Sequence, residues 1–161
     1  AIDSADVIIL TSPVYVYHCT GSMKAWLDHY GYRWMLHRPN TDMFSKQGVC
    51  ISTAAGAGTK WTNKDMADSM FFWGMGKIYR YGTAVHAINY KSISPEKMAE
   101  IEKATDKLAE KIRKNYGHVK PVLKTKTYFE VMRKLVKSGW NEVDVAYWKE
   151  HGWTEKARPW K

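Results

Sequence analysis

The sequence predicts an α/β fold built on a sheet of parallel strands, and three features of the chain lead to that prediction. Residues 7–10 (VIIL) form a short aliphatic run without polar alternation, which is typical of a strand buried on both faces. Residues 47–53 (QGVCIST) predict a second strand. Each run is followed by a loop and then by an amphipathic segment with helical spacing, and strands that alternate with helices indicate parallel βαβ units.

The first of these units is expected to bind a ligand. The strand at residues 7–10 should end at Pro13, because proline has no N–H to donate to a sheet ladder. The loop after it is more aromatic than an ordinary surface loop, and Gly21 then opens a helix. Open α/β sheets bind ligands where a strand end meets the N-terminus of the next helix. The apolar face of this helix is predicted to contain Met23, Trp26, Leu27 and Tyr30.

The next two segments continue the alternation. Residues 31–46 are rich in aromatic and basic side chains. We expect a loop that covers a ligand, contacts a partner subunit or has only a packing role within the domain. Residues 62–73 predict a helix, with Thr62 or Asn63 as its N-cap and Asp65 in its first turn.

The last strand and the longest helix complete the domain. Residues 81–88 predict the final strand of the sheet. His86 lies in it and could belong to a site, although a single histidine at a strand end more often has a structural hydrogen bond. Residues 95–116 predict a long amphipathic helix, because Ser94 is a good cap and Pro95 suits the first helical position.

Residues 117–161 are expected to form a helical extension of the domain at residues 1–116. Apolar side chains at helical spacing predict one helix that ends near Gly139, and Asn141 should cap a shorter one. Tryptophans interleave with Lys and Arg in this extension, a mixture that could stack the bases of single-stranded nucleic acid. The favoured interpretation is that they anchor the extension to the domain or to a partner subunit, because Trp and Arg are enriched at interfaces.

The composition is that of one globular domain. The chain has 161 residues, 45% of them hydrophobic, which suffices for a sizeable core. No apolar run approaches the roughly 18 residues of a transmembrane helix, so no membrane partner is expected. The net charge of +9 is assigned to solvated helix faces, so nucleic acid is not expected as a partner. Cys19 and Cys50 lack the spacing of a metal site, which predicts no bound metal and free thiols in a cytoplasmic protein.

Residues 5–28 (ADVIILTSPVYVYHCTGSMKAWLD) carry a recognisable pattern. It is roughly A-D-x-I-hydrophobic-x-S-P-V-Y, a short spacer, and then G-x-hydrophobic-K-x-hydrophobic-hydrophobic-D. This segment resembles the third strand, flavin loop and following helix of the flavodoxin-like NADPH-dependent FMN reductase family, and the resemblance extends over about residues 1–116. It implies a flavodoxin-like three-layer α/β/α domain with a parallel sheet and a C-terminal helical tail. The domain would be N-terminally truncated, because no strand or phosphate loop precedes residue 7.

The resemblance also implies a flavin site at one edge of the sheet. FMN would lie between the aromatic loop and the glycine-rich loop after residues 47–53, where small residues allow close approach of the backbone. NAD(P)H would be the co-substrate, and since the flavin carries the hydride, no catalytic side chain is assigned. The cofactor-binding residues expected on this basis are Ser12, Pro13, Val14, Tyr15, Tyr17, Thr53, Ala54, Ala55, Gly56 and Gly58.

Two functions therefore remain open. One is an FMN-dependent NAD(P)H oxidoreductase, and the other is a truncated flavodoxin-like protein that acts through self-association without catalysis. In the flavodoxin strand order, loss of the first strand leaves residues 7–10 as an open edge, and open edges invite pairing with another chain. The sequence thus predicts a homo-oligomer, or cover for this strand from a swapped element or from residues 117–161.

Overall fold

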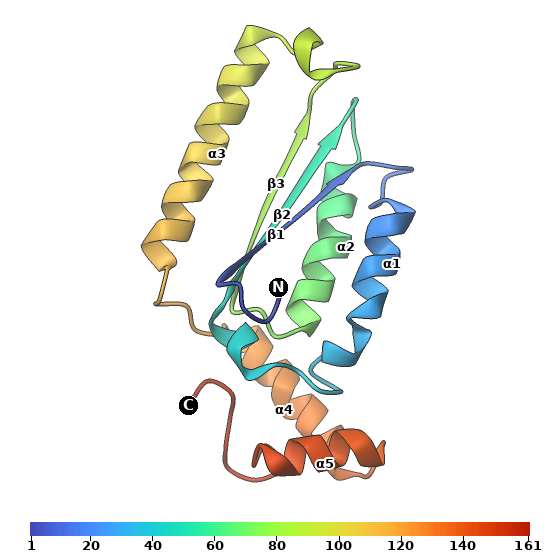
Figure 1. Ribbon diagram of the computed structural model, residues 1–161, viewed down its shortest axis with the longest axis vertical. Helices are drawn as coiled ribbons and strands as arrows, with labels where there is room; N and C mark the ends of the chain where they lie inside the picture. Colours follow the sequence, from blue (N-terminus) through green and yellow to red (C-terminus); the bar gives the residue numbers. More distant parts are fainter.

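The computed structural model describes residues 1–161 and contains a three-stranded parallel sheet with helices on both faces (Figure 1). Strands β1 (Val7–Pro13), β2 (Gln47–Ala54) and β3 (Lys77–Ala84) lie in the order β1-β2-β3. Both strand pairs are parallel, with Leu10 beside Cys50. The predicted α/β class with parallel strands in three layers is confirmed.

Helices α1 (Gly21–His29) and α2 (Thr59–Phe72) cover one face of the sheet (Figure 1). They follow β1 and β2 in the chain, as the crossover connections of parallel strands require. The main core lies between these helices and the sheet, and its buried members on the helix side include Met66, Met70 and Trp73.

Helix α3 (Pro95–Asn115) lies against the opposite face, with Ser94 as its N-cap as predicted. Its hydrogen bonds to the sheet reach β2 and β3, for example from Gln47 Nε2 to the carbonyl oxygen of Ile112 (3.0 Å). No such bond reaches β1, and Ile9 is 56% exposed on this face. The prediction that residues 7–10 are buried on both faces is therefore wrong, because α3 covers only part of the sheet.

Several element boundaries differ from the sequence prediction. Strand β3 ends at Ala84 and not at residue 88, so the prediction that His86 lies in this strand is wrong. Strand β3 begins at Lys77, four residues before the predicted start at Tyr81, because it pairs along the whole of β2 from Gln47 onward. Helix α2 begins at Thr59, so Asp65 lies near its middle and not in its first turn.

The C-terminal extension forms α4 (Leu123–Lys137) and α5 (Glu142–Glu150), beyond the amino ends of the strands (Figure 1). Asn141 caps α5 as predicted. Trp148 and Trp153 are buried in a second core cluster together with Met35 and Phe44. These tryptophans therefore anchor the extension to residues 31–46, which form two short 3-10 helices and have a packing role.

The extension also settles one expectation about β1. Trp148 Nε1 donates to the carbonyl oxygen of His37 (2.7 Å), and Tyr147 donates to that of Pro39 (2.8 Å). Residues 117–161 thus pack on the segment between α1 and β2 and do not cover the outer edge of β1. Of the three kinds of cover expected for β1, namely a second copy, a swapped element or this extension, the structure excludes the extension.

Candidate functional site

The carboxyl ends of the three strands meet at one edge of the sheet, and hydrogen bonds link the loops that follow them. The N–H of Val14 donates to the carbonyl oxygen of Thr53 (2.9 Å), and the N–H of Val85 donates to that of Ala54 (2.9 Å). The opposite edge is occupied by residues 31–46 and the C-terminal helices (Figure 1). The carboxyl edge is therefore where the chain can receive a ligand.

Residues 15–18 form a tight two-residue turn, which we call the aromatic turn. Tyr15 and His18 exchange two backbone hydrogen bonds of 3.0 Å each, and the residues between them are left-handed, with φ of 48° at Val16 and 66° at Tyr17. Turns of this type favour Gly, Asn and Asp, and a β-branched residue with positive φ is an outlier. Each strained residue costs roughly 1–3 kcal/mol, and such strain persists only where the surroundings hold it.

The aromatic turn presents apolar side chains and free donors to solvent. Tyr15 is 64% exposed, Tyr17 57% and Val16 91%. The backbone N–H groups of Val16 and Tyr17 donate to no acceptor in the protein. The turn therefore offers exposed aromatic rings and open N–H donors at the carboxyl edge of the sheet.

Residues 55–58, the small-residue loop, touch the aromatic turn at Gly58. The φ of Gly58 is +102°, and a Cβ on this residue would lie 2.6 Å from Val14 Cγ1 and 3.1 Å from Tyr17 Cα. Only glycine fits this close approach. The backbone N–H groups of residues 55–58 also donate to no acceptor in the protein. Two loops with open donors therefore meet at one point.

Ser12 makes hydrogen bonds to residues on both sides of the aromatic turn. Its side chain is buried, and its hydroxyl donates to the carbonyl oxygen of Pro13 (2.9 Å) while accepting from the N–H of Thr20 (3.1 Å). Thr20 in turn caps α1 by accepting from the N–H of Met23 (3.2 Å). Ser12 thus connects the end of β1 to the start of α1.

Asp65 on α2 reaches the loop from the other side. Its Oδ2 accepts from the N–H of Cys19 (3.1 Å), and the Nδ1 of His18 lies 3.0 Å and 3.2 Å from the two carboxylate oxygens. Burial raises the pKa of the Cys19 thiol, and the nearby Asp65 carboxylate raises this pKa further. Sequence reasoning missed this pair, because His18 and Asp65 are 47 positions apart and meet only through the packing of α2.

The predicted site residues are distributed as follows. The structure brings Val14 and Tyr17 into contact with Gly58. Tyr15, Thr53, Ala55 and Gly56 are exposed at the same edge, Pro13 ends β1, and Ser12 and Ala54 are buried beneath the loops. His86 is exposed in the loop after β3, has a φ of 48°, and donates its N–H to the carbonyl oxygen of Ala55 (3.1 Å).

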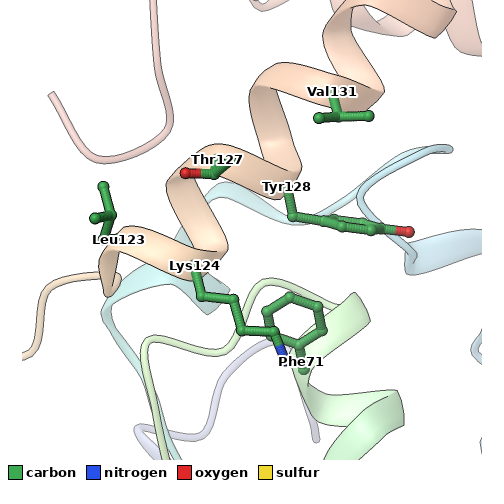
Figure 2. A pocket seen from close by; sticks show the side chains of 6 residues that line it. All are labelled: Phe71, Leu123, Lys124, Thr127, Tyr128 and Val131. Atoms are coloured by element: carbon green, nitrogen blue, oxygen red, sulfur yellow. The ribbon is translucent and has the colours of Figure 1, made fainter.

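A separate groove lies on the C-terminal extension (Figure 2). It has a volume of about 490 Å³ and is bounded by α4 and by Phe71 at the end of α2, with Lys124 Nζ 4.4 Å from the Phe71 ring centre. Its other lining residues are Leu123, Thr127, Tyr128 and Val131. This groove is distant in the fold from the carboxyl edge and holds none of the predicted site residues.

Two further features of the chain bear on the kind of site present. No group of three or more His, Cys, Asp or Glu side chains is arranged to hold a metal ion. None of the α-helices combines the length and the apolar composition that crossing a bilayer requires.

Comparison with known proteins gives one family match and two structural likenesses. The family model described as "NADPH-dependent FMN reductase" matches residues 1–89. A thermophilic tryptophan halogenase from Streptomycin violaceusniger is 16% identical with a TM-score of 0.46, covering 63% of this chain and 67% of the halogenase. General stress protein 14 from Treponema denticola, solved in complex with FMN, is 12% identical with a TM-score of 0.46, covering 71% of this chain and 68% of that protein. The comparison with curated proteins finds no match.

Proposed function

Since the chain belongs to the NADPH-dependent FMN reductase family, whose model matches residues 1–89 of 161, we propose that it is an FMN-dependent oxidoreductase that uses NAD(P)H. One observation carries the proposal beyond family membership. The aromatic turn and the small-residue loop, which follow different strands, touch at Gly58 and present open N–H groups at the carboxyl edge of the sheet.

The residues at this edge fit the flavin ring. The ring is flat and aromatic, and its polar edge bears carbonyl oxygens and nitrogens that accept hydrogen bonds. Tyr15 and Tyr17 supply exposed aromatic faces, and the N–H groups of residues 16–17 and 55–58 supply donors without protein acceptors. We assign ring contacts to these residues, to the exposed Thr53 and to the Val14 side chain, with Ser12, Pro13 and Ala54 shaping the loops beneath.

The chemistry is divided between cofactor and protein. When bound, FMN accepts a hydride from NAD(P)H and delivers reducing equivalents to an acceptor. The protein residues bind and orient the ring, because rings held in the correct position react faster than freely diffusing ones. The strained turn serves this role, since its shape is set before the ligand arrives and less ordering remains to be done on binding.

The proposal is tested by titrating the apoprotein with FMN and following flavin fluorescence. We expect saturable quenching, and bleaching of the flavin absorbance when NADPH is added without oxygen. Tyr17→Ala should weaken FMN binding about tenfold, because an aromatic pair contributes about 0.5–1.5 kcal/mol beyond its buried area. Trp140→Ala is the matched control, since Trp140 is an exposed aromatic residue between α4 and α5.

Two outcomes would contradict the proposal. Wild-type protein that leaves FMN fluorescence unchanged would exclude a flavin site formed by this chain. Equal FMN affinity for Tyr17→Ala and Trp140→Ala would place the flavin away from the aromatic turn.

We also propose that the chain forms a homo-oligomer through β1 and resides in the cytoplasm. No strand of residues 1–161 pairs with the outer edge of β1, and Ile9 is exposed beside it, which favours pairing with a second copy. Self-association without catalysis is the alternative function that this edge supports. The cytoplasmic assignment is supported by Cys19 and Cys50, which are both free thiols.

A further inference from the structure

We propose that Asp65 is the positioning residue of the flavin site, because it holds the aromatic turn in the shape that presents Tyr15 and Tyr17. The effect of this role on FMN binding rests on the proposed function. The attachment of the aromatic turn to Asp65, which we call the clamp, is a property of the protein alone and can be measured without cofactor.

The carboxylate of Asp65 makes all its loop contacts at the end of the aromatic turn. It accepts from the N–H of Cys19 (3.1 Å) and lies 3.0 Å from the Nδ1 of His18. The Asp65 side chain is 26% exposed and that of His18 is 64% exposed. A partly buried carboxylate that accepts two donors from adjacent residues makes charge-assisted bonds, which are stronger than neutral ones. Asp65 thus connects rigid helix α2 to the loop.

The aromatic turn needs such an attachment. Val16 and Tyr17 have left-handed backbones, and their exposed side chains have little packing to hold them there. The Gly58 contact limits the turn on one side. Asp65 supplies a second attachment through the side chain of His18. His18 also closes the turn, because its backbone N–H donates to the carbonyl oxygen of Tyr15. The strained geometry is therefore held from two directions.

The neighbouring charges are already paired, which distinguishes Asp65 from them. Lys24 on α1 pairs with Asp28, and Lys64 on α2 pairs with Asp68. Both pairs lie within one helix at four-residue spacing. The Asp65 carboxylate makes its side-chain contacts with the loop instead. Asp68, on the same helix and in the same hollow between α1 and α2, is therefore a matched control.

The first experiment measures amide hydrogen exchange in the apoprotein by NMR. Asp65→Ala should speed exchange of the Tyr15 and His18 amides at least tenfold, because these two bonds close the turn. Asp65→Asn keeps one acceptor oxygen, so its exchange rates should lie between those of wild type and Asp65→Ala. Asp68→Ala should leave both amides at wild-type rates. Equal rates in Asp65→Ala and Asp68→Ala would overturn the clamp.

A double-mutant cycle tests whether the clamp opposes backbone strain. Val16→Gly removes the steric cost of positive φ without losing packing, because the Val16 side chain is almost fully exposed. The effect of Asp65→Ala on the Tyr15 and His18 amides should be smaller in the Val16→Gly background. An effect of the same size in both backgrounds would show that Asp65 does not hold a strained turn.

The final experiment separates this inference from the proposed function. In FMN titrations, Asp65→Ala should bind at least tenfold more weakly than Asp68→Ala, Asp65→Asn should recover part of the affinity, and the thermal midpoints of the two alanine variants should agree. If wild-type protein binds no FMN, the proposed function fails, but the exchange data still show whether Asp65 holds the aromatic turn. If FMN binds but Asp65→Ala retains wild-type affinity, the positioning role is wrong and the proposed function stands.

Discussion

At the scale of single residues, Cys50 shows how the sheet controls side-chain chemistry. It lies in β2, fully buried, with its Sγ 3.7 Å from the Sδ of Met70. Desolvation raises the pKa of its thiol to about 12 from the usual 9.0, while the charge of Arg80 acts in the opposite direction. The thiolate is the reactive form of cysteine, so this residue stays inert at neutral pH.

The raised pKa of Cys50 predicts a loss of stability in alkali. Between pH 9 and 12 the folded protein retains a thiol proton that the unfolded chain has lost, so the free energy of unfolding falls as pH rises. Urea unfolding is compared at pH 7 and pH 10. Between these two pH values, the free energy of unfolding of wild type should fall by about 1 kcal/mol more than that of Cys50→Ala. The pH 7 values serve as control, because both proteins carry no thiolate there. A difference between the two proteins that does not change with pH would refute the expectation.

At the scale of elements, α4 joins the C-terminal extension to the rest of the chain. Phe129 on its inner face is fully buried and stacks on Trp148 of α5, with ring centres 4.7 Å apart and an interplanar angle of 21°. The same ring meets Phe44 edge to face. One side chain thus contacts both the extension and residues 31–46.

Removing this ring should destabilise the protein strongly. Phe129→Ala should lower the free energy of unfolding by about 3–5 kcal/mol, because it removes a large buried side chain and leaves a cavity. Leu135→Ala on the same helix is the control and should cost far less, since Leu135 is exposed. Urea unfolding monitored by tryptophan fluorescence measures both. Similar losses in the two variants would mean that α4 does not depend on its inner face.

At the scale of the whole molecule, the two helical layers cover the sheet to different extents. Two helices and the main core cover one face of all three strands, while α3 covers only part of the other face. Strand β1 is consequently open along its outer edge and on one face, where Ile9 is exposed. Exposed apolar residues beside an unpaired strand edge favour association.

Self-association through β1 can be measured by sedimentation. We expect wild type to dimerise and Ile9→Lys to remain monomeric, because a charge on the open face of β1 discourages pairing. Val143→Lys adds the same charge at an exposed apolar position of α5 and should leave the dimer intact. Monomeric wild type at all concentrations would refute this prediction.

The sequence predicted the features that depend on local stereochemistry. The short runs that became β1 and β2 and the caps Ser94 and Asn141 could all be read from neighbouring residues. The start of β3 at Lys77 could not, because it is set by pairing with β2. The exposure of Ile9 was missed for a related reason: an aliphatic run is equally compatible with one or two covered faces.

By itself, then, the amino-acid sequence determined the α/β class and the presence of an aromatic segment and a small-residue segment after two of its strands. Those features follow from backbone preferences, hydrophobic spacing and glycine content over short segments. The tertiary structure alone decided that Gly58 touches Tyr17, that Asp65 contacts His18 and that the extension leaves β1 uncovered. Each of these depends on contacts between segments far apart in the chain, and such contacts are set by how helices and strands pack, not by the local sequence.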